Sequence, residues 1–243
     1  MKLANVILIT AIALGVVFLS GLGVWQMKRL AWKEALIARV ETNLSAAPLS
    51  LQDIKAMQQQ GKDIEYRPVH LSGIFDHSRE QHFFATHKGS PGYFVYTPLQ
   101  LNEGDFIFVN RGYVPLQVKA ANGRAQGQVA GQVELTGLAR SAPTTKPNSF
   151  VPDNDLKKNV YHWKSLPQMQ SRAFGHDSDG AINVLPFFVD ANDAVNPGGL
   201  PKGGVTLIQF PNSHLQYALT WFGLAGALLA VGGYFLFGRM RRN

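Results

Sequence analysis

His214 has clear potential for ligand chemistry, because its imidazole opens a long uncharged segment. It lies in the stretch PNSHLQYALTWF, residues 211–222, and no charged side chain occurs in residues 215–238. Asn212 or Ser213 is predicted to cap a helix that starts here. In the first turn of that helix, unpaired N–H groups create a positive potential that disfavours imidazolium. A neutral ring keeps a lone pair, which an iron centre binds.

Aromatic and small residues share the helix face of His214. At 100° per residue, Tyr217 and Trp221 fall within about 60° of its direction. Ala218 and Ala225 fall in the same sector, which predicts a shallow groove beside the aromatic rings. The alternative is an interfacial belt, since Tyr, Trp and His commonly lie at headgroup level. The residues alone leave both interpretations open.

Arg111 is a second candidate, in the stretch FVNRGYVP, residues 108–115. This stretch is typical of a strand end, where an arginine is solvated or paired with a carboxylate. The functional alternative is a guanidinium fork aimed at an anionic group such as a propionate. Spacing does not decide between them.

The remaining motifs favour no catalytic or metal chemistry. His77, His82 and His87 recur every five residues, a spacing that shares a face on neither a strand nor a helix. Solvated strand or turn histidines are therefore expected. The chain has no cysteine, no nucleophile elbow and no phosphate-binding glycine loop. None of these motifs requires an enzyme.

Two uncharged segments are long enough to span a bilayer and bracket the rest of the chain. The predicted organisation is a transmembrane helix over 3–27, a water-soluble domain over 28–213, a second transmembrane helix over 214–238 and a basic tail over 239–243. A cleavable signal peptide is the alternative for the first segment. We favour an uncleaved anchor, because a helical apolar pattern continues through residues 28–43.

Charge placement indicates orientation and argues against nucleic acid as a partner. All 16 acidic residues lie between the spans, whereas Lys2, Arg239, Arg241 and Arg242 flank them and supply over half of the +7 net charge. The basic tail predicts both termini in the cytoplasm and a periplasmic central domain. No amphipathic presequence precedes the first span, which favours a bacterial inner membrane over organelle import.

The central domain is predicted to be β-rich, as a mostly antiparallel sandwich or partly closed barrel. A short helix is expected over 50–60, capped by Ser50, and a helical turn over 165–174. Alternating apolar runs punctuated by Gly, Pro, Asn and Asp predict about seven strands, over residues 66–76, 80–88, 92–101, 105–115, 132–140, 182–192 and 204–210. The fold class is thus an α+β membrane protein.

In this order, the motifs resemble the Surfeit locus protein 1 family of cytochrome c oxidase assembly factors. The segments that carry the resemblance are GVWQMKRLAWKEALI, YRPVHLSGIFD, PGYFVYTPL, VNRGYVP, LTGLAR and PNSHLQYALTWFGLA. Two departures stand out: Tyr113 replaces a usual Trp, and Ser213 replaces a common Asn. Neither removes a charged or ligating group.

The resemblance implies a protein that is not an enzyme and that helps haem a reach subunit 1 of a haem–copper oxidase in the bacterial membrane. It implies that His214 takes part in haem binding, with Trp221 nearby, so His214 is the expected iron ligand. Tyr217 on the same face and Arg111, as a propionate partner, complete the expected haem a contacts. Expected partners are cytochrome c oxidase subunit 1, haem a synthesis proteins and membrane lipid. The alternatives are a scaffold that binds no haem, and a binding module for an unrelated envelope complex.

Overall fold

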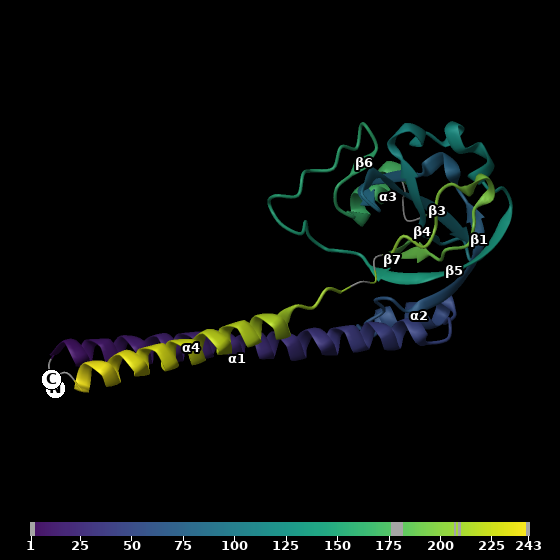
Figure 1. The fold of residues 1–243 in the computed structure, drawn as a ribbon. Helices are drawn as coiled ribbons and strands as arrows, with labels where there is room; N and C mark the ends of the chain where they lie inside the picture. Colours follow the sequence, from purple (N-terminus) through teal and green to yellow (C-terminus); the bar gives the residue numbers. More distant parts are fainter. Residues whose placement is uncertain (1–2, 176–181, 207, 209, 242–243) are drawn as a thin grey trace. The chain divides into compact units, whose positions relative to one another are not determined.

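The computed structural model of the protein describes residues 3–175, 182–206, 208 and 210–241. The chain divides into two compact units, which are drawn together in Figure 1. The hairpin unit comprises Met1–Arg39 and Ile208–Asn243, and the barrel unit comprises Val40–Leu207.

The hairpin unit is built from two long apolar helices, α1 (Leu3–Ser45) and α4 (His214–Arg241). Both are long and apolar enough to cross a membrane, and only 6% and 11% of their most apolar windows are buried. A core helix of a water-soluble protein would be mostly buried, so these exposed faces suit a lipid environment. The helical extension predicted over 28–43 is confirmed, since α1 continues without a break to Ser45.

The two helices run antiparallel, with small residues where they approach each other. A Cβ atom at Gly15 would lie 2.8 Å from Leu228, and one at Gly23 would lie 2.6 Å from the Phe222 ring. Residues later in α1 are therefore opposite residues earlier in α4. Close backbone approach at glycine and alanine is the usual packing of helices in lipid.

The barrel unit holds a seven-stranded sheet in the order β1-β5-β7-β4-β3-β2-β6. Its strands are β1 (Pro68–Phe75), β2 (Gln81–His87), β3 (Ser90–Leu101), β4 (Phe106–Pro115), β5 (Gln132–Ser141), β6 (Val160–Tyr161) and β7 (Val184–Ala191). Strand β1 pairs with β5 and also, over Gly73–Phe75, with β3. Five strands thus form a partly closed barrel, as predicted. Pairing is mostly antiparallel, but β4–β7 and β2–β6 are parallel.

Six of the predicted strands are confirmed and the seventh is wrong. Residues 204–206, 208 and 210 are not in a strand, while residues 207 and 209 lie outside the described residues. Gly198, Gly199 and Gly204, which precede or begin this stretch, have positive φ angles. Residues other than glycine rarely adopt that backbone conformation. The two-residue strand β6 was not predicted, because it is too short to show alternation.

The predicted short helices are present. Helix α2 (Leu51–Gln59) starts at a capping box, in which Ser50 and Asp53 each bond the backbone N–H of the other. Helix α3 (Leu166–Phe174) starts after Ser165. Short 3-10 helices occur at η1 (His77–Arg79), η2 (Leu116–Val118), η3 (Ala121–Gly127) and η4 (Pro197–Gly199).

The central strands are buried on both faces. On β4, Ile107 and Val109 belong to a core that includes Ile54 of α2, whereas Phe106 and Phe108 belong to a second core that includes Met169 of α3. Covering both faces explains why this strand reads as a continuous apolar run rather than an alternating one.

A β-bulge interrupts β4 at the Asn-Arg-Gly sequence. Val95 of β3 faces Gly112, and the next residue, Tyr96, faces Asn110, so Arg111 is the additional residue. Gly112 has φ +126, and a Cβ atom there would collide with the carbonyl oxygen of Lys202. Bulges redirect a side chain out of the strand pattern. The bulge therefore directs the side chain of Arg111 out of the regular alternation of β4.

Candidate functional site

Helix α4 begins at His214, as the sequence indicates. The side-chain oxygen of Asn212 accepts a hydrogen bond from the His214 backbone N–H at 3.3 Å. The first helical bond runs from the Tyr217 N–H to the Ser213 carbonyl at 3.2 Å. Asn212, one of the two predicted caps, therefore satisfies an N–H group that the helix itself leaves unpaired.

The imidazole of His214 is held by a residue of the other helix. Its Nδ1 atom lies 2.7 Å from Oε1 of Gln26 on α1. An amide oxygen only accepts hydrogen bonds, so Nδ1 carries a proton and donates it. Gln26 is 9% exposed and His214 is partly buried, so the bond orients a ring that is still partly accessible.

The other ring nitrogen of His214 is available for a ligand. Among the residues that the structure describes, Nε2 has no hydrogen-bond partner. In the tautomer with its proton on Nδ1, the imidazole has its lone pair on Nε2. A hydrogen bond from the distal nitrogen is also the usual support of a metal-bound histidine. The donor chemistry fits a single bond to iron.

The groove predicted on this face of α4 is not open. Ala218 and Ala225 are 1% and 5% exposed, respectively. Small residues allow close helix approach, so this stripe is buried in the hairpin instead of lining a groove. Tyr217 is exposed and Trp221 is partly buried. An aromatic surface thus remains beside His214, without the cleft that the sequence predicted.

Two cations lie on the same face of α1 as Gln26. Arg29 and Lys33 follow Gln26 by three and seven residues, a spacing that places all three along one helix face. The Lys33 ammonium group lies 5.3 Å from the centre of the Phe210 ring, four residues before His214. The hairpin unit therefore carries positive charge on the helix face of Gln26. The sequence places Arg29 and Lys33 in a segment that resembles the family but assigns them no role.

Arg111 belongs to the barrel unit and is 2% exposed. Its guanidinium donates to the Gly127 carbonyl at 2.5 Å and to the Asn196 side chain at 3.1 Å. It also lies over the Phe75 ring, at 4.8 Å. Burial, with a smaller contribution from Arg124, lowers its pKa to about 10. The hydrogen bonds from Arg111 stabilise the folded barrel unit.

A small cavity adjoins Arg111. Its volume is about 180 Å³, and it is lined by Phe75, Asn196 and residues of the loop that follows β7. Drug-sized ligands occupy roughly 300–1,000 Å³, and a porphyrin needs at least as much. The expectation that Arg111 binds a propionate stays a prediction, and this geometry gives it no support.

The histidines at 77 and 82 are not solvated as expected. The Nε2 atom of His77 is 2.8 Å from the Val129 carbonyl, and burial lowers the pKa of this partly buried ring. His82 is buried, 3.2 Å from Glu80, which also pairs with Arg124. Burial would raise the pKa of Glu80, but His82 and Arg124 outweigh it and lower that pKa.

No group of three metal-binding side chains occurs among the described residues. The side chains of His77, Glu80, His82, Arg111 and Arg124 are linked by hydrogen bonds and ion pairs. This network connects β2 to η1, to η3 and to the bulge in β4. Sequence spacing did not reveal this network, because its members come from four separate elements.

Gln26 lies in a segment that carries the family resemblance, but sequence reasoning missed its role as the partner of His214. The signal was an amide near the end of an uncharged segment of 25 residues, 3–27, whose other amide, Asn5, lies at the opposite end. Polar groups at that depth are costly unless they find a partner. A search for a complementary polar group in the other span would have included His214 among its candidates.

Comparison with known proteins agrees with the resemblance seen in the motifs. The SURF1 family matches residues 13–226. The chain is 37% identical over 224 residues to Surfeit locus protein 1 of Rattus norvegicus, covering 85% of this chain and 68% of the relative. It is also 37% identical over 225 residues to the Homo sapiens protein, covering 85% and 70%.

A more distant relative gives the same assignment. The SURF1-like protein of Drosophila melanogaster is 34% identical over 226 residues, covering 85% of this chain and 70% of the relative. The matched region includes the part of α1 that carries Gln26, all the strands of the barrel unit and the start of α4 at His214. The chain belongs to the SURF1 family.

Proposed function

We propose that this protein is a non-enzymatic assembly factor for a haem–copper cytochrome c oxidase, which holds haem a transiently at His214. Family membership supports the first part, because oxidase assembly is the role that the resemblance implies. The second part rests on the hairpin unit. The alternative is a scaffold that stabilises an assembly intermediate through protein contacts alone.

The hydrogen bond between Gln26 and His214 is the observation that carries the proposal. It joins a buried amide on α1 to an imidazole on α4 at 2.7 Å. An interfacial belt residue needs no such partner, since its amphipathic ring is stable at headgroup level by itself. A ligand does need it, because the bond sets the tautomer and the ring orientation.

The residues that would hold haem a are on the hairpin unit. His214 would offer Nε2 to the iron, with Tyr217 and Trp221 beside the ring. Arg29 and Lys33 would face the two propionates, and they suit this task better than Arg111, whose donors are occupied within the barrel unit. When bound, haem a supplies an iron that accepts one imidazole lone pair. One side-chain ligand favours release over permanent binding.

The proposed location is a bacterial inner membrane with both termini in the cytoplasm. Arg239, Arg241 and Arg242 follow the second span, and positive charge favours the cytoplasmic side. The barrel unit then lies in the periplasm. The proposed partners are cytochrome c oxidase subunit 1, which would receive haem a, and the haem a synthesis proteins, which would supply it.

The test is a haem measurement on purified protein from a host that makes haem a. We expect the detergent-solubilised wild type to show a haem absorption band and His214→Ala to lose it. Gln216→Ala is the matched control, because this exposed neighbour lies about 200° around the helix from His214. If His214→Ala retains the band while oxidase assembly proceeds normally, His214 is not the ligand. If no variant carries haem but deletion of the gene still lowers oxidase levels, the scaffold role replaces the carrier role.

A further inference from the structure

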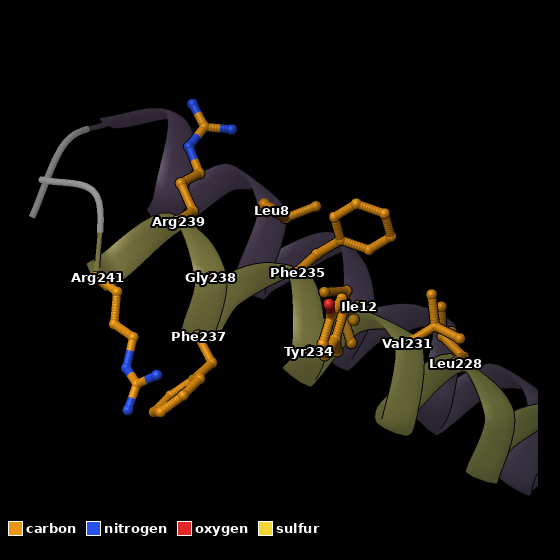
Figure 2. A pocket seen from close by; sticks show the side chains of 11 residues that line it. Leu8, Ile12, Leu228, Val231, Tyr234, Phe235, Phe237, Gly238, Arg239 and Arg241 are labelled. Carbon is orange, nitrogen blue, oxygen red and sulfur yellow. The ribbon is translucent and has the colours of Figure 1, made fainter.

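The hairpin unit has an apolar groove at the end of α4 far from His214. Figure 2 shows this groove, whose volume is about 820 Å³. The helix rises about 1.5 Å per residue, so Arg241 lies roughly 40 Å along α4 from His214. The groove is lined by Leu8 and Ile12 of α1 and by Leu228, Val231, Gly232, Tyr234, Phe235, Phe237, Gly238, Arg239 and Arg241 of α4.

Two glycines of α4, Gly232 and Gly238, line the groove. A Cβ atom at Gly232 would lie 2.6 Å from Ile12, so the two helices are in contact there. A Cβ atom at Gly238 would meet no atom within 4 Å, so a longer side chain there would have open space to occupy.

The two sides of the groove change from apolar to cationic along the helix. On one side, Phe235 is followed one turn later by Arg239. On the other, Arg241 lies 4.5 Å over the Phe237 ring. Figure 2 shows these two arginine side chains projecting to opposite sides of α4. The groove is thus apolar along its length and cationic at its end, an arrangement that is complementary to an anionic lipid.

The charge at this end calls for an anionic occupant. No acidic side chain occurs in residues 1–27 or 215–243. The 28 residues of α4 are about 42 Å long, more than the roughly 30 Å of a hydrocarbon core, so its last turn extends to headgroup level. Guanidinium groups bind phosphate in fork geometry. Each cation at an anionic membrane surface strengthens binding about fivefold.

We infer that this groove is a binding site for an anionic phospholipid. One acyl chain lies against Phe237 and Gly238, and the phosphate is bound by Arg241, which follows Phe237 by one turn on the same side of α4. Any bilayer covers these helices with acyl chains. Beyond this general coverage, the groove prefers lipids with negative headgroups. It holds an acyl chain in a position that a side chain at residue 238 would fill.

The experiment compares retained lipid on the full-length protein by native mass spectrometry. Purified protein is reconstituted into nanodiscs that contain equal amounts of dioleoyl phosphatidylglycerol and dioleoyl phosphatidylcholine, then extracted with mild detergent. We expect the wild type to retain phosphatidylglycerol at least fivefold over phosphatidylcholine. Arg241→Gln lowers that ratio about fivefold. Gly238→Leu lowers the total retained lipid.

Gly233→Leu is the matched control for the filled groove. A Cβ atom at Gly233 also meets nothing within 4 Å, and this residue does not line the groove. It should retain lipid like the wild type, and equal helix content by circular dichroism verifies that each variant folds. Equal retention of the two lipids by the wild type would overturn the inference. So would a Gly233→Leu loss as large as that of Gly238→Leu, which would indicate non-specific annular lipid.

Discussion

The Nδ1 atom of His214 and the Oε1 atom of Gln26 are 2.7 Å apart, joining the start of α4 to α1. This pair is separated by 188 positions in the sequence. It gives the imidazole a defined tautomer and leaves the lone pair of Nε2 for a ligand, which we propose is iron. The proposed carrier role depends on this arrangement.

Gln26→Leu removes the acceptor and leaves the ring of His214 without orientation. We expect haem retention by the purified protein to fall about tenfold or more, which is the usual effect of losing the partner of a metal-bound histidine. Gln26→Glu keeps an acceptor oxygen and should retain haem. Wild-type haem content in the leucine variant would show that this hydrogen bond does not support the ligand.

Lys33→Met tests the proposed propionate contacts. Its ammonium group is partly buried near Phe210, and an ion pair at such a position contributes about 0.2–1 kcal/mol. We expect a two- to fivefold loss of haem affinity in a detergent titration, and a weaker salt dependence than in the wild type. Lys28→Met is the matched control, because Lys28 lies two residues from Gln26 and faces away from it. Equal losses in both variants would point to a general effect of charge.

Arg111→Ala is expected to destabilise the barrel unit without reducing haem binding. The change leaves the Gly127 carbonyl and the Asn196 side chain without their donors, at a cost of about 3 kcal/mol. Thermal unfolding should show a Tm lower by roughly 6–12 °C. Arg79→Ala, at a more exposed arginine, should change Tm much less. A stable Arg111→Ala protein that loses haem would instead revive Arg111 as a propionate partner.

The barrel unit is expected to lose stability in two stages on acidification. Burial lowers the pKa of His77 below its ordinary 6.5, so below that pH the unfolded chain takes up a proton that the folded chain resists. The pKa of Glu80 lies below its ordinary 4.5, because His82 and Arg124 outweigh the effect of burial. Its contribution is complete above pH 4.5 and is lost as the pH falls through the folded value.

Melting curves between pH 8 and pH 3 measure both stages. His77→Gln should flatten the decline that starts near pH 6.5, and Glu80→Gln should flatten the decline below pH 4.5. Each substitution leaves the other stage in place, since the two groups titrate in different ranges. A His77→Gln protein with the wild-type pH profile would show that this ring does not contribute.

The strands and short helices were predictable because each carries its own local pattern. Ser50 and Asp53 are three residues apart, and six apolar runs have turn residues at both ends. The run 204–210 has the composition of a strand but is not one in its described residues. Strand β6 was missed because two residues carry no period. Local composition does not determine whether a segment finds a pairing partner.

The geometry of the candidate site was less predictable, because it depends on helix–helix contacts. The sequence places Ala218 and Ala225 on the His214 face, and a single helix with that face would have a groove. In the hairpin unit these residues are buried, since small side chains are where two helices meet. In the same way, Gln26 acquires its role only from the residue opposite. For Arg111, the sequence did not show the β-bulge that makes it the additional residue of β4.

Coordination of iron by the His214 imidazole is the central claim, and chemical rescue tests it most directly. The visible absorption and electron paramagnetic resonance spectra of haem-loaded wild type, His214→Gly, and His214→Gly with added imidazole would be compared. We predict a nitrogen-ligated spectrum in the wild type, its loss in the glycine variant, and its return when imidazole fills the vacated position. An unchanged spectrum in His214→Gly without imidazole would contradict the claim.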